Sequence, residues 1–206
     1  NPKKVNLSVG VYQDDDGKTP TFESVTLAEK KLIDINPSKT YKPIDGDPIF
    51  LNESLKLVLG ESLYSKFNSN TFGFNTPGGT GALKLASDFL YSFSNKSKVW
   101  LSNPTWPNHG PVFNSSGFEI QNYDYFDKNN HKIDFKKMID SISSIPENDI
   151  IVLHGCCHNP TGADMNKDQW VEITELIKNK NLITICDFAY QGLGDGVEED
   201  AVGVRN

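Results

Sequence analysis

Short apolar runs alternate with amphipathic segments along most of the chain. Residues 149–155 and 181–187 are almost continuously apolar before they end in polar residues, a pattern typical of strands buried on both faces of a sheet. Further strands are predicted at 71–76, 98–102 and 117–123, from short runs of apolar and β-prone residues.

Helical periodicity fills the segments between these strands, because apolar residues recur there every three or four positions. The predicted helices cover 23–33, 48–59, a segment that follows PGGTG at 77–81, 133–142 and 166–179. The third of these helices is expected to turn Leu83, Ala86, Phe89, Leu90 and Phe93 inward. Asn166 is a plausible N-cap for the last helix, with Gln169 completing a capping box.

The alternation of strands and helices predicts an α/β protein with a mainly parallel sheet. Ligands of open α/β sheets bind outside the carboxyl ends of the strands. Functional residues are therefore expected in the segments that follow the predicted strands, which read GGTG, NPTWPNH, HNPTG and DFAYQG.

Composition narrows the possible functions. The chain has 206 residues, enough for one good-sized domain or for one domain and part of another. A net charge of −7 argues against nucleic acid and anionic membranes as partners, and no apolar run approaches the roughly 20 residues of a membrane span. Three cysteines, two of them adjacent, form no disulfide framework, so a reducing compartment is expected. Arg205 is the only arginine, which makes recognition of an acidic substrate by this chain alone weak.

Gly78, Gly79 and Thr80 stand where a predicted helix begins. Free backbone N–H groups and the helix dipole attract an anion at such a position, most often a phosphate. The alternative is a tight strand-to-helix turn, because the segment is neither GxGxxG nor a Walker motif.

Asp187 ends an apolar strand, where a carboxylate needs a partner or a polar ligand. It is either a cap or salt-bridge residue, or the partner of a protonated ring nitrogen or a metal. Tyr190 follows three residues later, so its hydroxyl is expected to reach the same cavity. Trp106 is either a core residue or a platform that stacks on a planar cofactor.

The stretch HGCCHNPTG at 154–162 raises the question of a metal site. Zinc ligands normally occur as separated pairs, whereas Cys156 and Cys157 are adjacent. His154 and His158 have helical spacing, but the preceding strand and the following proline argue against a helix that would align them. We therefore expect no metal and interpret the cysteines as small packing residues.

Six motifs, VNLSVGVY, YKPIDG, TPGGTGAL, NPTWPNH, HGCCHNPTG and CDFAYQG, occur in this order in aspartate aminotransferases. The chain resembles these fold type I enzymes, which use pyridoxal phosphate (PLP), over nearly its whole length. The resemblance implies an incomplete large domain with a mainly parallel sheet and helices on both faces. Residues 1–19 would form a strip contributing to the small domain, and residues 20–206 would be part of the PLP-binding large domain.

The resemblance also implies roles for individual residues around the cofactor ring. Asp187 would pair with the pyridinium nitrogen and make the ring an electron sink. Asn159 and Tyr190 would bond to its phenolic oxygen, and Trp106 would stack on it. His109 would contact Asp187 rather than the cofactor and hold it in position, and we expect His154 nearby.

Phosphate and substrate contacts follow from the same resemblance. Gly78, Gly79 and Thr80 would hold the phosphate, while Tyr41 would reach the phosphate of the neighbouring subunit, because these enzymes build each site at a homodimer interface. Gly10 would line the substrate side, together with Trp106 and Asn159.

The implied reaction is amino transfer between L-aspartate and 2-oxoglutarate, which gives oxaloacetate and L-glutamate. It needs a lysine linked to the cofactor and arginines for the substrate carboxylates, and the resemblance places these beyond Asn206. We therefore expect the amino-terminal part of a longer enzyme, inactive alone and cytoplasmic, with a mitochondrial form as the alternative. The other readings are an aromatic amino-acid aminotransferase, a naturally short non-catalytic domain with the PLP fold, and a nucleotide-binding oxidoreductase.

Overall fold

A computed structural model describes residues 10–206, and the chain divides into two compact units, 1–42 and 43–206. Residues 1–9 of the predicted strip 1–19 lie outside the described part, and the assignment of that strip to a small domain stays a prediction. The first unit contains helix α1 (Glu23–Ile35), close to the predicted 23–33. Helix α1 ends where Asn36 takes a left-handed conformation and its N–H donates to the carbonyl of Leu32.

The second unit is built on a four-stranded parallel sheet with strand order β2-β1-β5-β6. Its strands are β1 (Val99–Asn103), β2 (Ile120–Asp124), β5 (Ile150–His154) and β6 (Ile183–Asp187). A separate antiparallel pair joins β3 (Phe126–Asp127) to β4 (Lys132–Ile133). The predicted parallel sheet is therefore confirmed.

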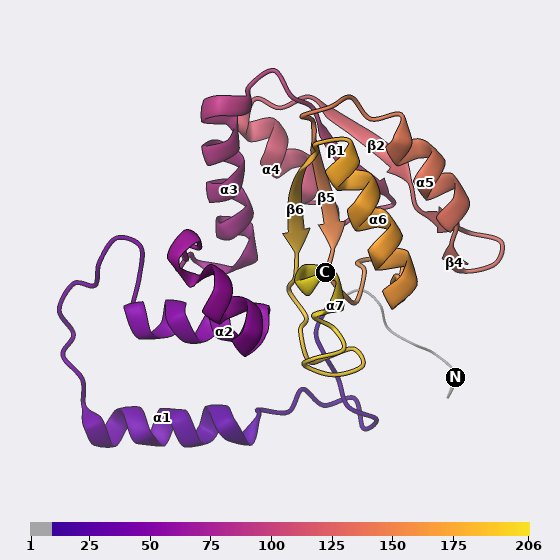
Figure 1. Cartoon of the computed structure of the whole chain (residues 1–206). Coiled ribbons are helices and arrows are strands. Elements are labelled where there is room, and N and C mark those ends of the chain that lie inside the picture. Colours follow the sequence, from indigo (N-terminus) through magenta and orange to yellow (C-terminus); the bar gives the residue numbers. More distant parts are fainter. Residues whose placement is uncertain (1–9) are drawn as a thin grey trace. The chain divides into compact units, whose positions relative to one another are not determined.

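Helices cover both faces of this sheet, as predicted (Figure 1). Those of the second unit are α2 (Pro48–Phe67), η1 (Asn68–Asn70), α3 (Gly78–Ser94), α4 (His109–Ser116), α5 (Phe135–Ser143), α6 (Lys167–Asn179) and α7 (Val202–Arg205). Residues Ile151 and Leu153 of β5 point into the core beneath α5 and α6, while Ile150 and Val152 point into the core beneath α3 and α4. This alternation decides which face each later residue of a strand occupies.

Helix α6 begins with the predicted capping box. The Asn166 side chain accepts a hydrogen bond from Gln169 N at 2.9 Å, and Gln169 Oε1 accepts one from Asn166 N at 3.0 Å. Both bonds satisfy N–H groups that the first turn of a helix leaves without partners, so the sequence alone locates this helix start.

Helix α2 is interrupted at Gly60, whose φ of 71° lies in the left-handed region. The interruption leaves carbonyl groups of the preceding turn available as acceptors. Arg205 donates to the carbonyls of Val58 and Leu57, each at 2.9 Å, and Gln191 also donates to Leu57 at 2.9 Å. The only arginine of the sequence therefore caps a broken helix, and the predicted helix 48–59 matches the part before the break.

Three expectations about burial and strands were wrong. Residues 71–76 form no strand, because their backbone has no ladder beside it in the described structure and Asn75 N bonds to the Asp45 carbonyl in a loop. Phe89 and Phe93 of α3 are 66% and 61% exposed, since Leu83, Ser87 and Leu90 occupy its buried face. Strand β6 is only half-buried, because it is an edge of the described sheet.

Within residues 10–206, no helix is both long enough and apolar enough to cross a membrane.

Candidate active site

His154 and Asp187 lie side by side at the carboxyl edge of the sheet, because the parallel register pairs these last residues of β5 and β6. Ile183 and Ile185 pack into the core beneath α3 and α4, and Asp187 continues that face of β6 by alternation. Thr184 takes the opposite face. The site is therefore built on the α4 side of the sheet.

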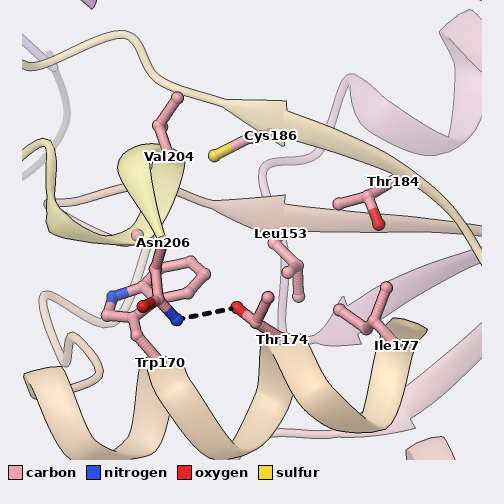
Figure 2. A pocket seen from close by; sticks show the side chains of 9 residues that line it. Leu153, Trp170, Thr174, Ile177, Thr184, Cys186, Val204 and Asn206 are labelled. Atoms are coloured by element: carbon pink, nitrogen blue, oxygen red, sulfur yellow. Dashed lines mark hydrogen bonds between the residues drawn. The ribbon is translucent and has the colours of Figure 1, made fainter. Parts of the chain in front are cut away.

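The opposite face of β6 is apolar. Figure 2 shows Thr184 and Cys186 directed into a pocket of about 230 Å³ beside α6, where Asn206 donates a hydrogen bond to Thr174 at 3.2 Å. Its lining is Leu153, Trp170, Thr174, Ile177, Thr184, Cys186, Gly203, Val204 and Asn206. Burial raises the pKa of Cys186 to about 12, so its thiol stays neutral and packs as an apolar group.

Asp187 stands at one end of a chain of hydrogen bonds. His109 Nε2 lies 2.9 Å from Asp187 Oδ2, and His109 Nδ1 lies 2.7 Å from Thr105 Oγ1. Thr105 Oγ1 is also 3.2 Å from His154 Nε2, and His154 Nδ1 accepts a longer bond of 3.4 Å from the backbone N–H of Asn159. The chain thus joins two of the residues that the sequence singled out, Asp187 and Asn159.

The direction of each bond in this chain follows from the groups at its ends. The Asn159 N–H can only donate, so His154 Nδ1 accepts and His154 carries its proton on Nε2. That proton goes to Thr105, whose single hydroxyl proton is then directed to His109 Nδ1 when the His109 ring is neutral. His109 Nε2–H donates to the Asp187 carboxylate, which can only accept. With a neutral His109 ring, all four bonds therefore point toward Asp187.

This arrangement keeps Asp187 ionised. Burial opposes its negative charge, but the hydrogen bond donated by His109, together with the electrostatic environment of the His109 and His154 rings, outweighs burial and holds the pKa of Asp187 below its ordinary value. Burial lowers the pKa of His154 to about 4, so that this ring stays neutral. Oδ1 of Asp187 accepts no hydrogen bond from the described residues and is not enclosed, so it is available to a ligand.

Trp106 and Tyr190 are both half-buried. Trp106 meets the His109 ring edge-on, with centroids 5.4 Å apart and an angle of 84° between the planes. The Tyr190 hydroxyl makes no hydrogen bond with the described residues. The structure thus brings Trp106, His109, His154, Asn159 and Asp187 together, while the predicted role of Tyr190 stays a prediction.

Gly78, Gly79 and Thr80 form the exposed first turn of α3, a helix of 17 residues. Pro77 precedes them and offers no side-chain cap. The Gly78 N–H donates to the Thr76 carbonyl at 2.8 Å, so the N–H groups of Gly79 and Thr80 are the ones open to an anion. Helix α3 runs antiparallel to the sheet, which puts this turn at the end to which the β5 and β6 arrows point (Figure 1).

Gly10 and Tyr41 belong to the first unit, where both are exposed. Their predicted substrate and phosphate contacts stay predictions.

Thr105 was missed by the sequence reasoning, although it links His109 to His154. The available signal was its position four residues before His109, in a Pro-rich loop that leads into a helix. A lone threonine in such a loop is usually a turn residue, so the pattern gave no reason to select it.

The two histidines of HGCCHNPTG do approach each other, with ring centroids 4.1 Å apart, although no helix aligns them. A turn after β5 brings them together. The nitrogens of His154 are bonded to Thr105 and Asn159, and those of His158 to other side chains, so neither ring has a free lone pair for a metal. Among residues 10–206 no group of three or more potential metal ligands occurs.

The two buried histidines predict that the stability falls with acidification. Their folded pKa values are about 4 for His154 and about 3 for His158, against an ordinary 6.5, so the unfolded chain binds protons first as the pH drops. The free energy of unfolding should decrease from pH 6.5 toward pH 4, with a slope of at most about 1.4 kcal/mol per pH unit for each histidine. Urea unfolding at several pH values measures the slope. His154→Gln should remove part of it, and His131→Gln, at an exposed turn, should leave it unchanged; equal slopes in both variants would contradict the assignment.

Comparison with known proteins gives one consistent family. The family model "Aminotransferase class I and II" matches residues 2–205. Aspartate aminotransferase of Escherichia coli (strain K12) is 44% identical over 204 residues, covering 99% of this chain and 52% of that protein. Tyrosine aminotransferase of Rhizobium meliloti (strain 1021) is 40% identical, covering 100% of this chain and 52% of that protein. The chain thus spans about half the length of the curated relatives it matches.

Solved structures of other proteins superimpose on this chain. The aromatic-amino-acid aminotransferase from Burkholderia pseudomallei, covalently bound to pyridoxal phosphate, superimposes with a TM-score of 0.93 at 40% identity. The match covers 100% of this chain and 51% of that one.

Proposed function

The chain belongs to the class I and II aminotransferase family, and we propose that the protein transfers amino groups with pyridoxal phosphate as its cofactor. The observation that carries this proposal is the chain of four hydrogen bonds that keeps Asp187 ionised, with one oxygen free, at the carboxyl edge of the sheet. The solved relative that binds the same cofactor supports it.

The chemistry of the available donors and acceptors fits the cofactor. An ionised carboxylate with a free oxygen suits a protonated ring nitrogen, which is the role proposed for Asp187. The uncapped first turn of α3, with Gly78, Gly79 and Thr80, suits a phosphate.

Side chains near the ring would complete the binding site. We assign the phenolic oxygen to Asn159 and Tyr190, and the ring face to Trp106. When bound, the cofactor supplies an electron sink for the substrate carbanion. Asp187 keeps the proton on the ring nitrogen, and His109 and His154 hold that carboxylate in place.

L-Aspartate and 2-oxoglutarate are the proposed substrates, with oxaloacetate and L-glutamate as products, because the Escherichia coli relative at 44% identity is an aspartate aminotransferase. An aromatic substrate is the second candidate, favoured by the aromatic-amino-acid aminotransferases among the relatives. Values of kcat/KM for aspartate and for phenylalanine distinguish the two, and a preference for phenylalanine would replace the first proposal with the second.

The remaining parts of the proposal concern the whole enzyme. Residues outside this sequence would supply the lysine that links to the cofactor and the arginines that bind the substrate carboxylates. Residues 1–19 would belong with the small domain and 20–206 with the large domain. The enzyme would be a cytoplasmic homodimer with shared sites, in which Gly10 lines the substrate side, and the 206-residue piece would be inactive alone.

Absorbance and activity of the full-length protein test the function together. We expect a cofactor band near the visible edge that shifts when aspartate is added and is restored by 2-oxoglutarate, since the amino group moves in two half-reactions. A protein of native mass near 22.9 kDa that binds the cofactor without turnover would contradict the enzyme and indicate a binding domain. A protein without the band would contradict the cofactor itself.

Tyr41→Phe should weaken cofactor retention, because the proposed hydrogen bond to the phosphate of the neighbouring subunit loses its donor. A bond to a charged group contributes about 1.5–3 kcal/mol, so the dissociation constant of the cofactor should rise roughly 10- to 100-fold. Equilibrium dialysis of the full-length protein measures it. Tyr12→Phe, which alters another exposed tyrosine of the same unit, should change nothing, and an unchanged constant in Tyr41→Phe would refute the contact.

A further inference from the structure

We infer that His158 is a positioning residue. Its hydrogen bonds connect the turn carrying Asn159 to Ser102 at the end of β1, and Ser102 in turn bonds to the loop carrying Trp106. The inference rests on the proposed function only in that these two residues contact the cofactor. His158 itself is 2% exposed and does not belong to the hydrogen-bond chain that ends at Asp187.

One side of the His158 ring is tied to the end of β1. Its Nε2 lies 3.0 Å from Ser102 Oγ, and Ser102 Oγ lies 2.9 Å from the carbonyl of Pro104. The carbonyl can only accept, so the single hydroxyl proton of Ser102 goes to Pro104. The bond with His158 then requires a proton on Nε2, and the ring donates toward the loop that contains Trp106.

The other side of the ring is tied to its own turn. With the proton on Nε2, Nδ1 is an acceptor and receives the hydroxyl proton of Thr161, whose Oγ1 lies 2.8 Å away. Thr161 Oγ1 in turn accepts from Ala163 N at 3.2 Å. Both bonds of the ring are therefore directional and satisfied, and a single tautomer of His158 is compatible with them.

Packing fixes the plane of the ring. Tyr125 stacks on His158 with centroids 4.1 Å apart and 14° between the planes, and the Tyr125 hydroxyl donates to Ala163 O at 2.6 Å. Asp164 accepts from the backbone N–H groups of Cys157 and His158, at 2.6 and 2.8 Å. The turn on which Asn159 sits is thus held from both ends.

These contacts restrict how far the loop carrying Trp106 and the turn carrying Asn159 can move relative to each other. Asn159 follows His158 directly, and Trp106 follows Pro104 by two residues, so a rigid His158–Ser102 bond fixes the spacing of the two loops. Burial lowers the pKa of His158 to about 3, so the ring stays neutral and keeps both hydrogen bonds at physiological pH. Loss of either hydroxyl partner leaves a buried ring nitrogen unpaired and frees the loops to move apart.

Variants of the full-length protein test the positioning role of His158. Thr161→Val removes the hydroxyl with little change in shape, whereas Thr161→Ser keeps it. We expect Thr161→Val and Ser102→Ala to raise the dissociation constant of pyridoxal phosphate about 10-fold and to lower kcat, and Thr161→Ser to behave as the wild type. Ser87→Ala is the control, because Ser87 is fully buried and bonds to Ser116 at 2.8 Å away from the site.

Nitrogen NMR of the cofactor-free protein gives a second readout, which is independent of activity. The His158 ring should show a protonated Nε2 and an unprotonated Nδ1 from pH 8 to pH 5. The opposite tautomer, or wild-type cofactor affinity in both Thr161→Val and Ser102→Ala, would overturn the inference. A wild-type protein that lacks the cofactor band would instead refute the proposed function, so the two failures are distinguishable.

Discussion

Replacement of Asp187 by alanine in the full-length enzyme is expected to lower the transamination rate about 10²–10⁴-fold while the fold is retained. The carboxylate is held ionised at the end of a hydrogen-bond chain, and its proposed partner is a buried positive nitrogen. Breaking a buried ion pair costs about 3–5 kcal/mol, which corresponds to between two and four powers of ten in rate. Single-turnover kinetics with aspartate measures the effect.

A second variant at this position separates charge from shape, and a variant on α5 serves as the control. Asp187→Asn retains an acceptor for His109 but no charge, so we expect a loss nearly as large as in the alanine variant. Asp140→Ala removes an exposed carboxylate from α5 and should leave the rate unchanged. A near-normal rate in Asp187→Ala, with the cofactor still bound, would refute the role at the ring nitrogen.

Replacement of Trp170 by alanine should reduce the free energy of unfolding by about 3–5 kcal/mol, the usual cost of truncating a buried tryptophan. Trp170 is 5% exposed and belongs to the core beneath α5 and α6. A Cβ at Gly203 would lie 2.4 Å from the indole, so α7 approaches this ring as only a glycine allows (Figure 2). Removal of the indole therefore enlarges the pocket and takes away a surface against which α7 packs.

Urea unfolding of the full-length protein measures this cost, and the neighbouring residue supplies the control. Val171 lies on the same helix but is 44% exposed, so Val171→Ala should change the free energy of unfolding by less than about 1 kcal/mol. Alanine favours the helix more than either tryptophan or valine does, so equal losses in both variants would contradict the assignment of the Trp170 effect to core packing. The pH slope assigned to the buried histidines should persist in both.

Local patterns predicted much of the fold. The continuous apolar run of β5 and the capping box of Asn166 and Gln169 depend on residues a few positions apart, and the structure agrees with both. The same holds for the strand ends, because parallel strands bring their carboxyl ends to one edge. The order of strands and helices along the chain is therefore sufficient to predict that Asp187 and the HNPTG turn lie near each other.

Other features depend on residues that are distant in the sequence. Ser87, a small polar residue, is buried on α3 while Phe89 is exposed, because Ser87 finds a hydroxyl partner in Ser116 on α4. Likewise, the break in α2 is capped by Arg205, more than a hundred residues later. No periodicity within either helix contains this information.

The sequence by itself determined the family, the alternation of strands and helices, and the candidate residues at the strand ends, since these follow from short-range order and from motifs. Only the tertiary structure decided how those residues are joined. Thr105 links two histidines 45 positions apart, and the direction of every bond from Asn159 to Asp187 follows from which end can donate and which can only accept. A hydrogen bond depends on distance and orientation in space, and packing fixes these for residues that the sequence keeps far apart.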